Sequence, residues 1–344
     1  MSPRQIFSHS KKISWAYLLV SFLLGILFTF SLLFSKLNLP FKTLNVSNES
    51  SQEHESNDYT FTRLKGFEHI RPLISVEPKY ESKRFGVLKS KLTDLLDSLK
   101  MSGTINEASV YLKELERGEW ISLNGEERYR PASLMKIPLL LSYLRMAEAT
   151  PGLLTQKMVY KKPDSVTIST QFYAPPAVQP GKEYTIHELL YYMVAHSDNN
   201  ATWLLASKFD ASVTKKLFDD FDLPEPVEDD EKFTLTPKEC SVFFNAIYNV
   251  AYLSPEYSEY AAALLSNCTF DKGFTKGFPK ETKMWHKFGE WRGAGHDAEL
   301  HESGIVYIHD KPYLLTVMTR GKDTDKLAEA IRAISQKTYE YVSP

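Results

Sequence analysis

A long apolar segment near the start of the chain is the clearest feature of its hydrophobic pattern. Residues Ile13 to Ser35 include no charged side chain, and Leu, Phe, Val and Ile dominate. A helix of these 23 residues rises roughly 35 Å, and the hydrocarbon core of a bilayer is about 30 Å thick. Arg4, Lys11 and Lys12 precede the segment and Lys36 follows it, which favours a cytoplasmic N-terminus. The pattern predicts a cytoplasmic N-terminus at residues 1–12 and a transmembrane anchor at residues 13–35.

A cleaved secretory signal peptide is the alternative for this segment. The apolar run is long for a signal peptide, and the sequence FSKLNLP that ends it is a poor small-residue cleavage site. Both interpretations place the rest of the chain outside the cytoplasm. The expected location is therefore the cell membrane, crossed once, with the main domain extracytoplasmic.

Residues 36–83 are expected to connect the anchor to the main domain. The stretch from Asn45 to Asp58 is polar, acidic and free of large apolar residues, which is typical of a tether. The stretch from Tyr59 to Lys83 has scattered apolar residues without a period. It is expected to pack on the domain as an irregular lead-in.

In the remaining chain, residues 84–344, the period of the hydrophobic pattern changes several times before about Ser266. An apolar stripe from Phe85 to Met101 predicts a helix. Residues Ala108 to Glu127 alternate on both sides of a turn at Arg117–Gly118, which predicts a β-hairpin. From Ile137 to about Ser266 helical patterns dominate, interrupted by a loop with Pro and Gly from Lys161 to Lys182.

The end of the chain returns to strands. Residues Gly304 to Arg320 predict a hairpin with its turn at His309–Pro312, and Lys322 to Val342 predict a closing helix. Strands from both ends that enclose a helical middle imply one sheet built by the two ends of the domain. The predicted fold class is α/β of the α+β kind, an antiparallel sheet flanked by helices with an inserted all-helical region.

Composition narrows the possible functions. The formal net charge is −2, and no long basic tract follows the first residues, so nucleic-acid binding is not expected. The two cysteines, Cys240 and Cys268, suit neither a disulfide scaffold nor a four-ligand zinc site. Each is expected in a helix, and whether they pair is open. The sequence has no metal cluster, phosphate-binding loop or cofactor motif, so no cofactor is expected.

Ser133 and Lys136 are the first candidate chemical groups. Three residues apart on a helix, they share one face. A serine hydroxyl becomes a good nucleophile when a base takes its proton, and a lysine can be that base when burial or a neighbouring cation lowers its pKa. The same Ser-x-x-Lys spacing recurs at Ser8–Lys11 and Ser212–Lys215, so the spacing alone is weak evidence.

The residues after Ser133 distinguish it from the other two serines. Pro138 is tolerated only in the first turn of a helix, which places Ser133 at a helix start. The helix is apolar nearly all round, which indicates a buried position for Lys136. The apolar residues are Leu134, Met135, Ile137, Leu139, Leu140, Leu141 and Leu144.

Two further short motifs follow along the chain. Ser197-Asp198-Asn199 stands before a helical segment, where a helix N-cap is the simpler interpretation. Lys287-Phe288-Gly289 occurs in a strand pattern, where a solvated lysine on an edge strand is the simpler interpretation.

Taken in order, Ser-x-x-Lys, Ser-Asp-Asn and Lys-x-Gly resemble the serine penicillin-recognising enzymes, the class A β-lactamases and the penicillin-binding proteins. The flanking sequences YRPASLMKIPLLLSYL, PGKEYTIHELLYYMVAHSDNNATWLLA, TLTPKE and HKFGEWRGAGHDAELHESGIVYI are similar to class A β-lactamases. The similarity covers about Arg84 to Val342. It implies the β-lactamase/DD-peptidase-like fold for residues 84–344.

The resemblance also implies roles for single residues. Ser133 is the expected nucleophile, with Lys136 as its general base or proton relay. Ser197 is expected to pass the proton to the leaving nitrogen. Lys287 is expected to supply positive charge for a substrate carboxylate and to lower the pKa of Lys136.

The implied substrate-binding groups surround these catalytic residues. Asn199 is expected to bind the substrate amide, and the backbone N–H groups of Ser133 and Glu290 are expected to form the oxyanion hole. Gly289 is expected to leave room for substrate along the strand. The family usually has Thr or Ser where Phe288 stands, so Arg292 or His296 is expected to bind the carboxylate instead, unless Phe288 only packs.

A second departure concerns release of the acyl group. Class A β-lactamases have a Glu-x-x-Leu-Asn segment whose glutamate activates the deacylating water, and this sequence has none on the route after Asn199. The glutamates on that route are Glu225, Glu228 and Glu231, in an acidic run that is more typical of a solvated loop. Tyr173 lies in the loop before the Ser-Asp-Asn motif. It is expected either to form a wall of the cleft or to be an exposed aromatic side chain.

These observations predict a membrane-anchored extracytoplasmic serine hydrolase that is acylated at Ser133 by a β-lactam or a related amide. Hydrolysis of the acyl-enzyme is expected to be slow. A D-alanyl-D-alanine peptidase acting on peptidoglycan peptides is the nearest alternative. A non-catalytic domain that binds wall fragments is the alternative from another class, but Ser133, Lys136, Ser197 and Lys287 argue against it because an inactive site is free to lose them.

Overall fold

The structure is a computed structural model that describes residues 58–64, 69, 72–161, 176–226, 232–293 and 295–343. The predicted anchor at residues 13–35 lies outside the described residues, as do Tyr173, Glu228 and Glu231. Within the described part of the chain, no helix is both long enough and apolar enough to cross a membrane.

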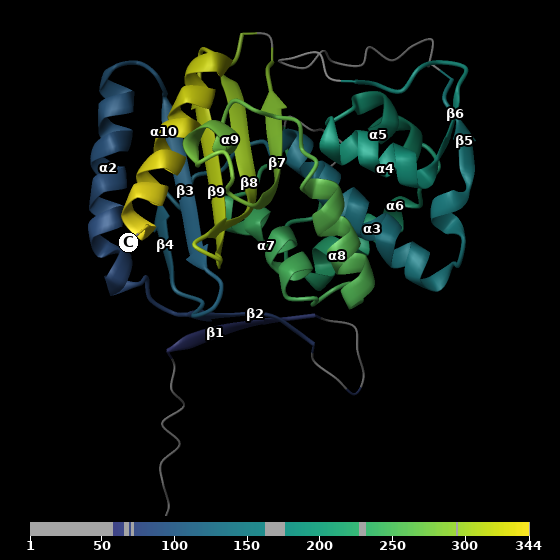
Figure 1. Ribbon diagram of the computed structural model, residues 1–344, viewed down its shortest axis with the longest axis horizontal. Coiled ribbons are helices and arrows are strands. Elements are labelled where there is room, and N and C mark those ends of the chain that lie inside the picture. The colour runs from purple at the N-terminus through teal and green to yellow at the C-terminus, as the bar shows by residue number, and fades with distance from the viewer. Residues whose placement is uncertain are drawn as a thin grey trace, which may run out of the picture. The chain divides into compact units, whose positions relative to one another are not determined.

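An antiparallel five-stranded sheet forms the centre of the domain. Its strands run in the order β4 (Trp120–Leu123), β3 (Glu107–Glu114), β9 (Lys311–Gly321), β8 (Ala298–Ile308) and β7 (Met284–Trp291). The first two strands come from the beginning of the domain and the other three from its end, so the predicted sheet is confirmed (Figure 1). Both predicted hairpins are also confirmed, because β3 pairs with β4 and β8 pairs with β9 in antiparallel register.

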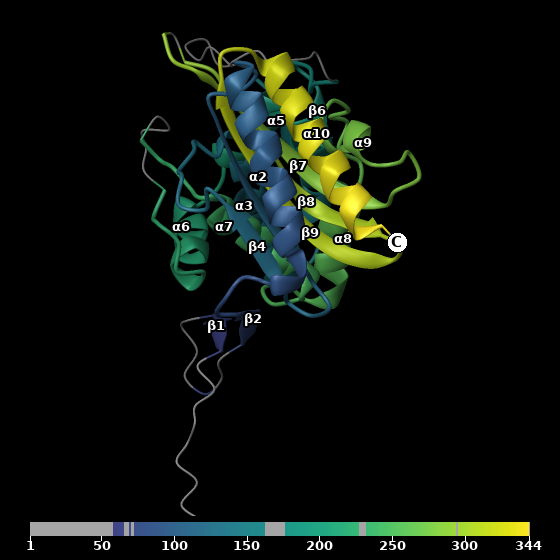
Figure 2. The ribbon, with the colours of Figure 1, turned by 90° about the vertical axis from the view of Figure 1, so that its left-hand side faces the viewer.

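Two long helices lie side by side over one face of this sheet. α2 (Gly86–Met101) and α10 (Thr324–Val342) contact each other, α2 contacts β4, and α10 contacts β8 and β9 (Figure 2). α10 begins after Asp323, whose carboxylate accepts hydrogen bonds from two backbone N–H groups of the first turn. The short helix α9 (Phe274–Gly277) packs against α10. The two predicted terminal helices are confirmed.

The inserted helical region is also confirmed. It contains α3 (Lys136–Ala149), α4 (Ile186–Ala195), α5 (Asn199–Ala206), α6 (Ala211–Asp220), α7 (Pro237–Tyr248) and α8 (Pro255–Leu265). Its short elements are the 3-10 turns η2 (Ala132–Met135) and η3 (Leu153–Thr155), and the paired strands β5 (Lys157–Val159) and β6 (Glu183–Thr185). α7 packs on β3, β8 and β9, opposite the face that α2 and α10 cover.

The lead-in before α2 differs from the prediction. Instead of irregular chain, β1 (Tyr59–Arg63) and β2 (Leu73–Pro78) form an antiparallel hairpin, followed by the 3-10 turn η1 (Lys83–Phe85). Ile74 on β2 is buried, and so is Glu77, whose carboxylate meets Lys113 at 3.0 Å and Lys238 at 2.7 Å. A charged residue therefore occupies an inward position, which hides the alternation that identifies a strand.

The two cysteines are separate. Cys240 lies in α7, but Cys268 follows the last residue of α8 by three positions, so the prediction that both lie in helices is wrong for Cys268. Both cysteines are free. α8 ends early because its C-terminal turn closes at Ser266.

Candidate active site

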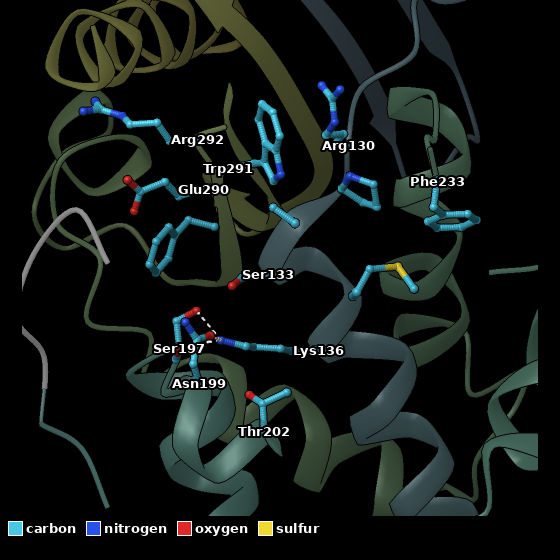
Figure 3. Close-up of a pocket in the computed structure, with 14 residues that line it drawn as sticks. Arg130, Ser133, Lys136, Ser197, Asn199, Thr202, Phe233, Glu290, Trp291 and Arg292 are labelled. Atoms are coloured by element: carbon cyan, nitrogen blue, oxygen red, sulfur yellow. Dashed lines mark hydrogen bonds between the residues drawn. The ribbon is translucent and has the colours of Figure 1, made fainter. Parts of the chain in front are cut away.

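Ser133 lies in the tight turn η2 that leads directly into α3. Ala132, the residue before it, has a left-handed φ of 49°, a conformation that costs a non-glycine residue about 1–2 kcal/mol. Pro138 is the third residue of α3, so the predicted helix start is confirmed. The strained turn presents the Ser133 hydroxyl to the cleft, on the side where Lys136 and Ser197 lie (Figure 3).

Lys136 is buried, with only 4% of its surface exposed. Its Nζ donates to the Ser197 carbonyl oxygen at 2.5 Å and to Asn199 Oδ1 at 2.8 Å, and it lies 3.1 Å from Ser197 Oγ (Figure 3). A neutral amine has two N–H bonds and one lone pair. The three oxygens match the three N–H bonds of the protonated amine, and loss of one proton leaves a lone pair that can accept a hydroxyl proton.

The charge state of Lys136 follows from its surroundings. Burial, and then repulsion from Lys287, hold its pKa well below the usual lysine value, while the Asp198 carboxylate acts in the opposite direction. Lys136 is therefore far more easily deprotonated than an exposed lysine. A neutral lysine beside a serine hydroxyl is the base that serine activation requires.

The Ser197–Asn199 segment is fixed by hydrogen bonds. Ser197 has a left-handed φ of 55° and is fully buried. Asp198 is the N-cap of α5 and accepts from the backbone N–H of Asn200 at 2.9 Å and of Val178 at 2.8 Å. The N-cap interpretation is thus correct for Asp198, and the same cap holds Ser197 and Asn199 against Lys136.

Lys287 lies on the edge strand β7, but it is not solvated, since none of its surface is exposed. Its Nζ donates to the Phe288 carbonyl oxygen at 2.9 Å and lies 4.0 Å from the centre of the Phe288 ring. Burial lowers its pKa to about 8, against the attraction of Cys268 and Glu302. Lys287 acts on Lys136 through its charge and is not among the residues that line the cleft.

The neighbours of Lys287 on β7 have packing roles. The Phe288 ring stacks on the Phe270 ring with centroids 4.3 Å apart, and 1% of Phe288 is exposed. A Cβ atom on Gly289 would lie 2.6 Å from the carbonyl oxygen of Pro131. The absence of a side chain at Gly289 therefore lets β7 approach the turn that carries Ser133.

A cavity of about 470 Å³ opens over these residues. It is lined by Arg130, Pro131, Ala132, Ser133, Met135, Lys136, Ser197, Asn199, Thr202, Phe233, Phe288, Glu290, Trp291 and Arg292. Six of the predicted catalytic and binding residues line this one cavity, namely Ser133, Lys136, Ser197, Asn199, Phe288 and Glu290. A volume of this size suits a small ligand.

Sequence reasoning missed two large side chains of the cleft. The Arg130 guanidinium lies 3.9 Å from the centre of the Trp291 ring, and its Nη1 lies 3.6 Å from Glu299. The stack closes one end of the cavity with a cationic and an aromatic surface. No local signal marked it, because Arg130 and Trp291 are far apart in the sequence.

The predicted substitutes for carboxylate binding are separated by the structure. Arg292 lines the cavity and donates to Thr324 Oγ1 at 2.5 Å. His296 is absent from the cavity lining and packs beside the Trp291 ring, with centroids 5.8 Å apart. Of the two predicted carboxylate-binding residues, only Arg292 is therefore placed to contact a ligand in the cavity.

Of the three glutamates in the acidic run after Asn199, the structure describes only Glu225, which is engaged in a surface ion pair. Glu225 pairs with Lys215 at 2.7 Å, and more than half of each side chain is exposed. Among the described residues, no group of His, Cys, Asp or Glu is arranged to hold a metal ion.

Comparisons with known proteins identify structures with this fold. The family model of the beta-lactamase enzyme family matches residues 88–342. A beta-lactamase from Chitinophaga pinensis superposes with a TM-score of 0.65 at 17% identity, covering 75% of this chain and 100% of its own. A beta lactamase from Xanthomonas campestris gives 0.63 at 19%, covering 74% and 99%, and PBP-A gives 0.58 at 19%, covering 73% and 96%. No curated protein matches.

At these identities the solved structures establish the fold, and the family match over most of the sequence establishes the relationship. The chain belongs to the beta-lactamase enzyme family.

Proposed function

We propose that this protein is a serine hydrolase that is acylated at Ser133 by a β-lactam or a related amide. The observation that carries the proposal is the buried Lys136 amine, held by Ser197 and Asn199 beside the Ser133 hydroxyl. Burial and repulsion from Lys287 lower its pKa well below the usual lysine value, which is the shift that a lysine general base requires.

The residues support the following sequence of steps. Lys136 takes the proton of Ser133 Oγ, which attacks the amide carbonyl. The backbone N–H groups of Ser133 and Glu290 stabilise the oxyanion. Ser197, whose Oγ lies 3.1 Å from Lys136 Nζ, passes a proton to the leaving nitrogen. The bond between carbonyl carbon and nitrogen breaks, and the acyl group remains on Ser133.

Substrate binding is proposed to use both polar residues and charge. Asn199 binds the substrate amide, and Lys287 contributes positive potential from beneath the cleft. Arg292, on the cavity wall, replaces the hydroxyl that Phe288 lacks as the partner of a substrate carboxylate.

The release step is proposed to be slow. The sequence lacks the Glu-x-x-Leu-Asn segment, and Glu225 is engaged with Lys215. Without a positioned base, water attacks the ester slowly and the acyl-enzyme persists. A related structure, a PBP-A mutant with a TM-score of 0.60 at 18% identity, is an acyl-enzyme complex with penicillin G.

A D-alanyl-D-alanine peptidase is the second candidate, and the same absence of a deacylating glutamate favours it. Peptidoglycan peptides would then be the substrates. Residues 13–35 are proposed to anchor the protein in the cell membrane with the catalytic domain outside, on the basis of their hydropathy and the flanking positive charges.

A fluorescent penicillin tests the proposal. We expect the wild-type protein to become labelled and to keep the label for minutes to hours, whereas Ser133→Ala gives no label. Ser212→Ala, at the other described Ser-x-x-Lys spacing, is the matched control and labels like the wild type. Absence of label on the wild type would contradict acylation at Ser133, and rapid loss with product formation would contradict slow release. Release of D-alanine from a peptide ending in D-alanyl-D-alanine would favour the peptidase.

A further inference from the structure

A second group of chemically active side chains lies next to β7, outside the cleft. Cys268 follows α8, His286 is on β7 and Glu302 is on β8. Glu302 is paired across the strands with Phe288, and His286 with Gly304, so Glu302 and His286 share a face of the sheet. This is the face opposite Lys287, because successive side chains of a strand point to opposite faces.

The three side chains contact one another in sequence. The His286 imidazole lowers the pKa of the Cys268 thiol through its charge and through hydrogen bonding. His286 Nδ1 lies 2.6 Å from Glu302 Oε1, and Glu302 Oε2 accepts from the backbone N–H of Phe274 at 2.9 Å. His286 is 2% exposed and Glu302 is fully buried. The order is nucleophile, base and orienting carboxylate.

Two glycines make room for this arrangement. A Cβ atom on Gly273 would lie 1.9 Å from Glu302 Oε2, and one on Gly304 would lie 2.5 Å from His286 Cβ. A side chain at Gly304 would also meet the Trp285 carbonyl oxygen at 2.5 Å, and one at Gly273 would displace the Glu302 carboxylate. The Glu302 carboxylate and the His286 imidazole occupy space that is open because Gly273 and Gly304 have no side chains.

We propose that Cys268, His286 and Glu302 form a reactive-cysteine site at which small disulfides modify the Cys268 thiolate. The Cys268 sulfur attacks one sulfur of the disulfide, a new S–S bond forms and the original S–S bond breaks. Cys268 is oxidised to a mixed disulfide, and the other half of the reagent is reduced and leaves as a thiolate. The His286 imidazolium then donates its proton to the departing thiolate, which becomes a thiol, and His286 is left neutral.

The electrostatics of the cluster support a thiolate. Burial raises the pKa of Cys268, but the charge and hydrogen bond of His286, with help from Lys287, bring it below the usual thiol value. Burial lowers the pKa of His286, and Cys268 and Glu302 raise it to about 10. The facing charges are thus Cys268, Glu302, His286 and Lys287, which form a balanced set when all are ionised.

Cys240 provides an internal comparison. It is 2% exposed, and burial raises its pKa with no imidazole to compensate. Cys268 is only partly buried. The two thiols of one protein are therefore expected to differ strongly in reactivity.

Modification at Cys268 is also expected to reach the active site. The next residue, Thr269, donates its backbone N–H to the Ala195 carbonyl at 2.8 Å, two residues before Ser197. Phe270 stacks on Phe288, beside Lys287. An adduct would move this segment and remove a negative charge near Lys287, which slows acylation at Ser133. This consequence rests on the proposed function.

Alkylation of the full chain by iodoacetamide tests the site directly. Peptide mass spectrometry follows Cys268 and Cys240 separately across pH. We expect Cys268 to react at least about tenfold faster than Cys240 at pH 7, with half-maximal rate below the ordinary thiol pKa of about 8.5. Equal rates, or a half-maximum at or above that value, would overturn the proposal.

Two variants test the partners. Glu302→Gln keeps the shape but not the charge, and His286→Asn removes the imidazole; each should move the half-maximum for Cys268 upward. Cys240→Ala is the matched control and leaves the Cys268 profile unchanged. Circular dichroism identifies a variant that unfolds, and the wild-type ratio of the two cysteines then still decides the proposal.

Cystamine tests the consequence. We expect a mixed disulfide on Cys268 and not on Cys240, and acylation by fluorescent penicillin about threefold slower or more. Cys268→Ser should be insensitive to cystamine. An adduct without slower acylation overturns the coupling alone, whereas an unmodified protein that never labels overturns the proposed function and leaves the cysteine site standing.

Discussion

Lys136 and Lys287 show how burial changes the acid–base properties of common residues. Neither side chain has more than 4% of its surface exposed, and the pKa of each lies below the usual lysine value. Their mutual repulsion favours one neutral and one charged lysine. Burial and repulsion from Lys287 hold the pKa of Lys136 well below the usual lysine value, whereas that of Lys287 is about 8, so the proposed roles are base for Lys136 and positive charge for Lys287.

The pH dependence of acylation should reflect both lysines. The rate rises as pH increases through the lowered pKa of Lys136, because only the neutral amine accepts a proton. It falls above about pH 8, where Lys287 loses its charge. Lys287→Arg should remove the alkaline limb, since a guanidinium does not titrate in this range. Second-order labelling rates between pH 5 and 10 measure both limbs.

Lys215→Arg is the control for this prediction, because Lys215 is exposed and outside the cleft. It should keep both limbs. An alkaline limb that survives in Lys287→Arg would assign it to another group.

At the scale of elements, β7 connects the two sites. Lys287 and Gly289 face the turn that carries Ser133, and His286 and Phe288 face the segment that follows α8. The close contact between β7 and η2 depends on a bare backbone at Gly289. The strand therefore sets the distance between Ser133 and the backbone of Glu290, the proposed second donor to the oxyanion.

Gly289→Ala should separate β7 from η2. The new methyl group would lie 2.6 Å from the Pro131 carbonyl oxygen, and such overpacking typically costs about 1–3 kcal/mol of stability. We expect the acylation rate to fall more than the stability explains, because the oxyanion donors move apart. Labelling kinetics and denaturant unfolding measure the two effects.

Gly86→Ala is the matched control, since a Cβ atom there meets nothing within 4 Å. It should leave the labelling rate and the stability nearly unchanged. An equal loss of activity in both variants would contradict a specific contact at Gly289.

At the scale of the whole domain, the β1–β2 hairpin is joined to the rest through Glu77. Its carboxylate accepts from Tyr111 at 2.9 Å and Lys113 at 3.0 Å, and pairs with Lys238 at 2.7 Å. Burial raises the pKa of Glu77, but the two lysines outweigh it and lower the value. The hairpin, the sheet and α7 thus meet at one carboxylate.

Glu77→Gln should destabilise the domain by about 3–5 kcal/mol, because Lys113 is left buried without its counter-charge. In the wild type, the contribution of Glu77 is fully present above the unfolded glutamate pKa of about 4.3 and is lost as pH falls from there through the lowered pKa of the folded state. Urea unfolding at pH 7 measures the destabilisation, and a series of unfolding curves at successively lower pH measures the loss.

Glu183→Gln provides the comparison, because the Lys157–Glu183 pair is exposed. It should cost less than about 1 kcal/mol. A similar effect of both variants would show that burial does not distinguish the two ion pairs.

Features that depend on neighbouring residues could be predicted from the sequence, and features that depend on contacts between distant segments could not. The helices α2 and α10 and the two sheet hairpins were predictable, because period and turn residues are local. The β1–β2 hairpin was not, since Glu77 becomes an inward residue only through Lys113 and Lys238. The Arg130–Trp291 stack and the burial of Lys287 likewise depend on packing between distant segments.

The sequence by itself determined the order of elements and the candidate catalytic side chains, since Ser133, Lys136, Ser197 and Lys287 stand in recognisable motifs. Only the tertiary structure decided their charge states, because desolvation and repulsion arise when separate segments enclose the amines. It also brought Cys268 to His286 and Glu302, which no spacing indicates. The motifs identified the side chains, and their packing in the folded domain shifted their pKa values.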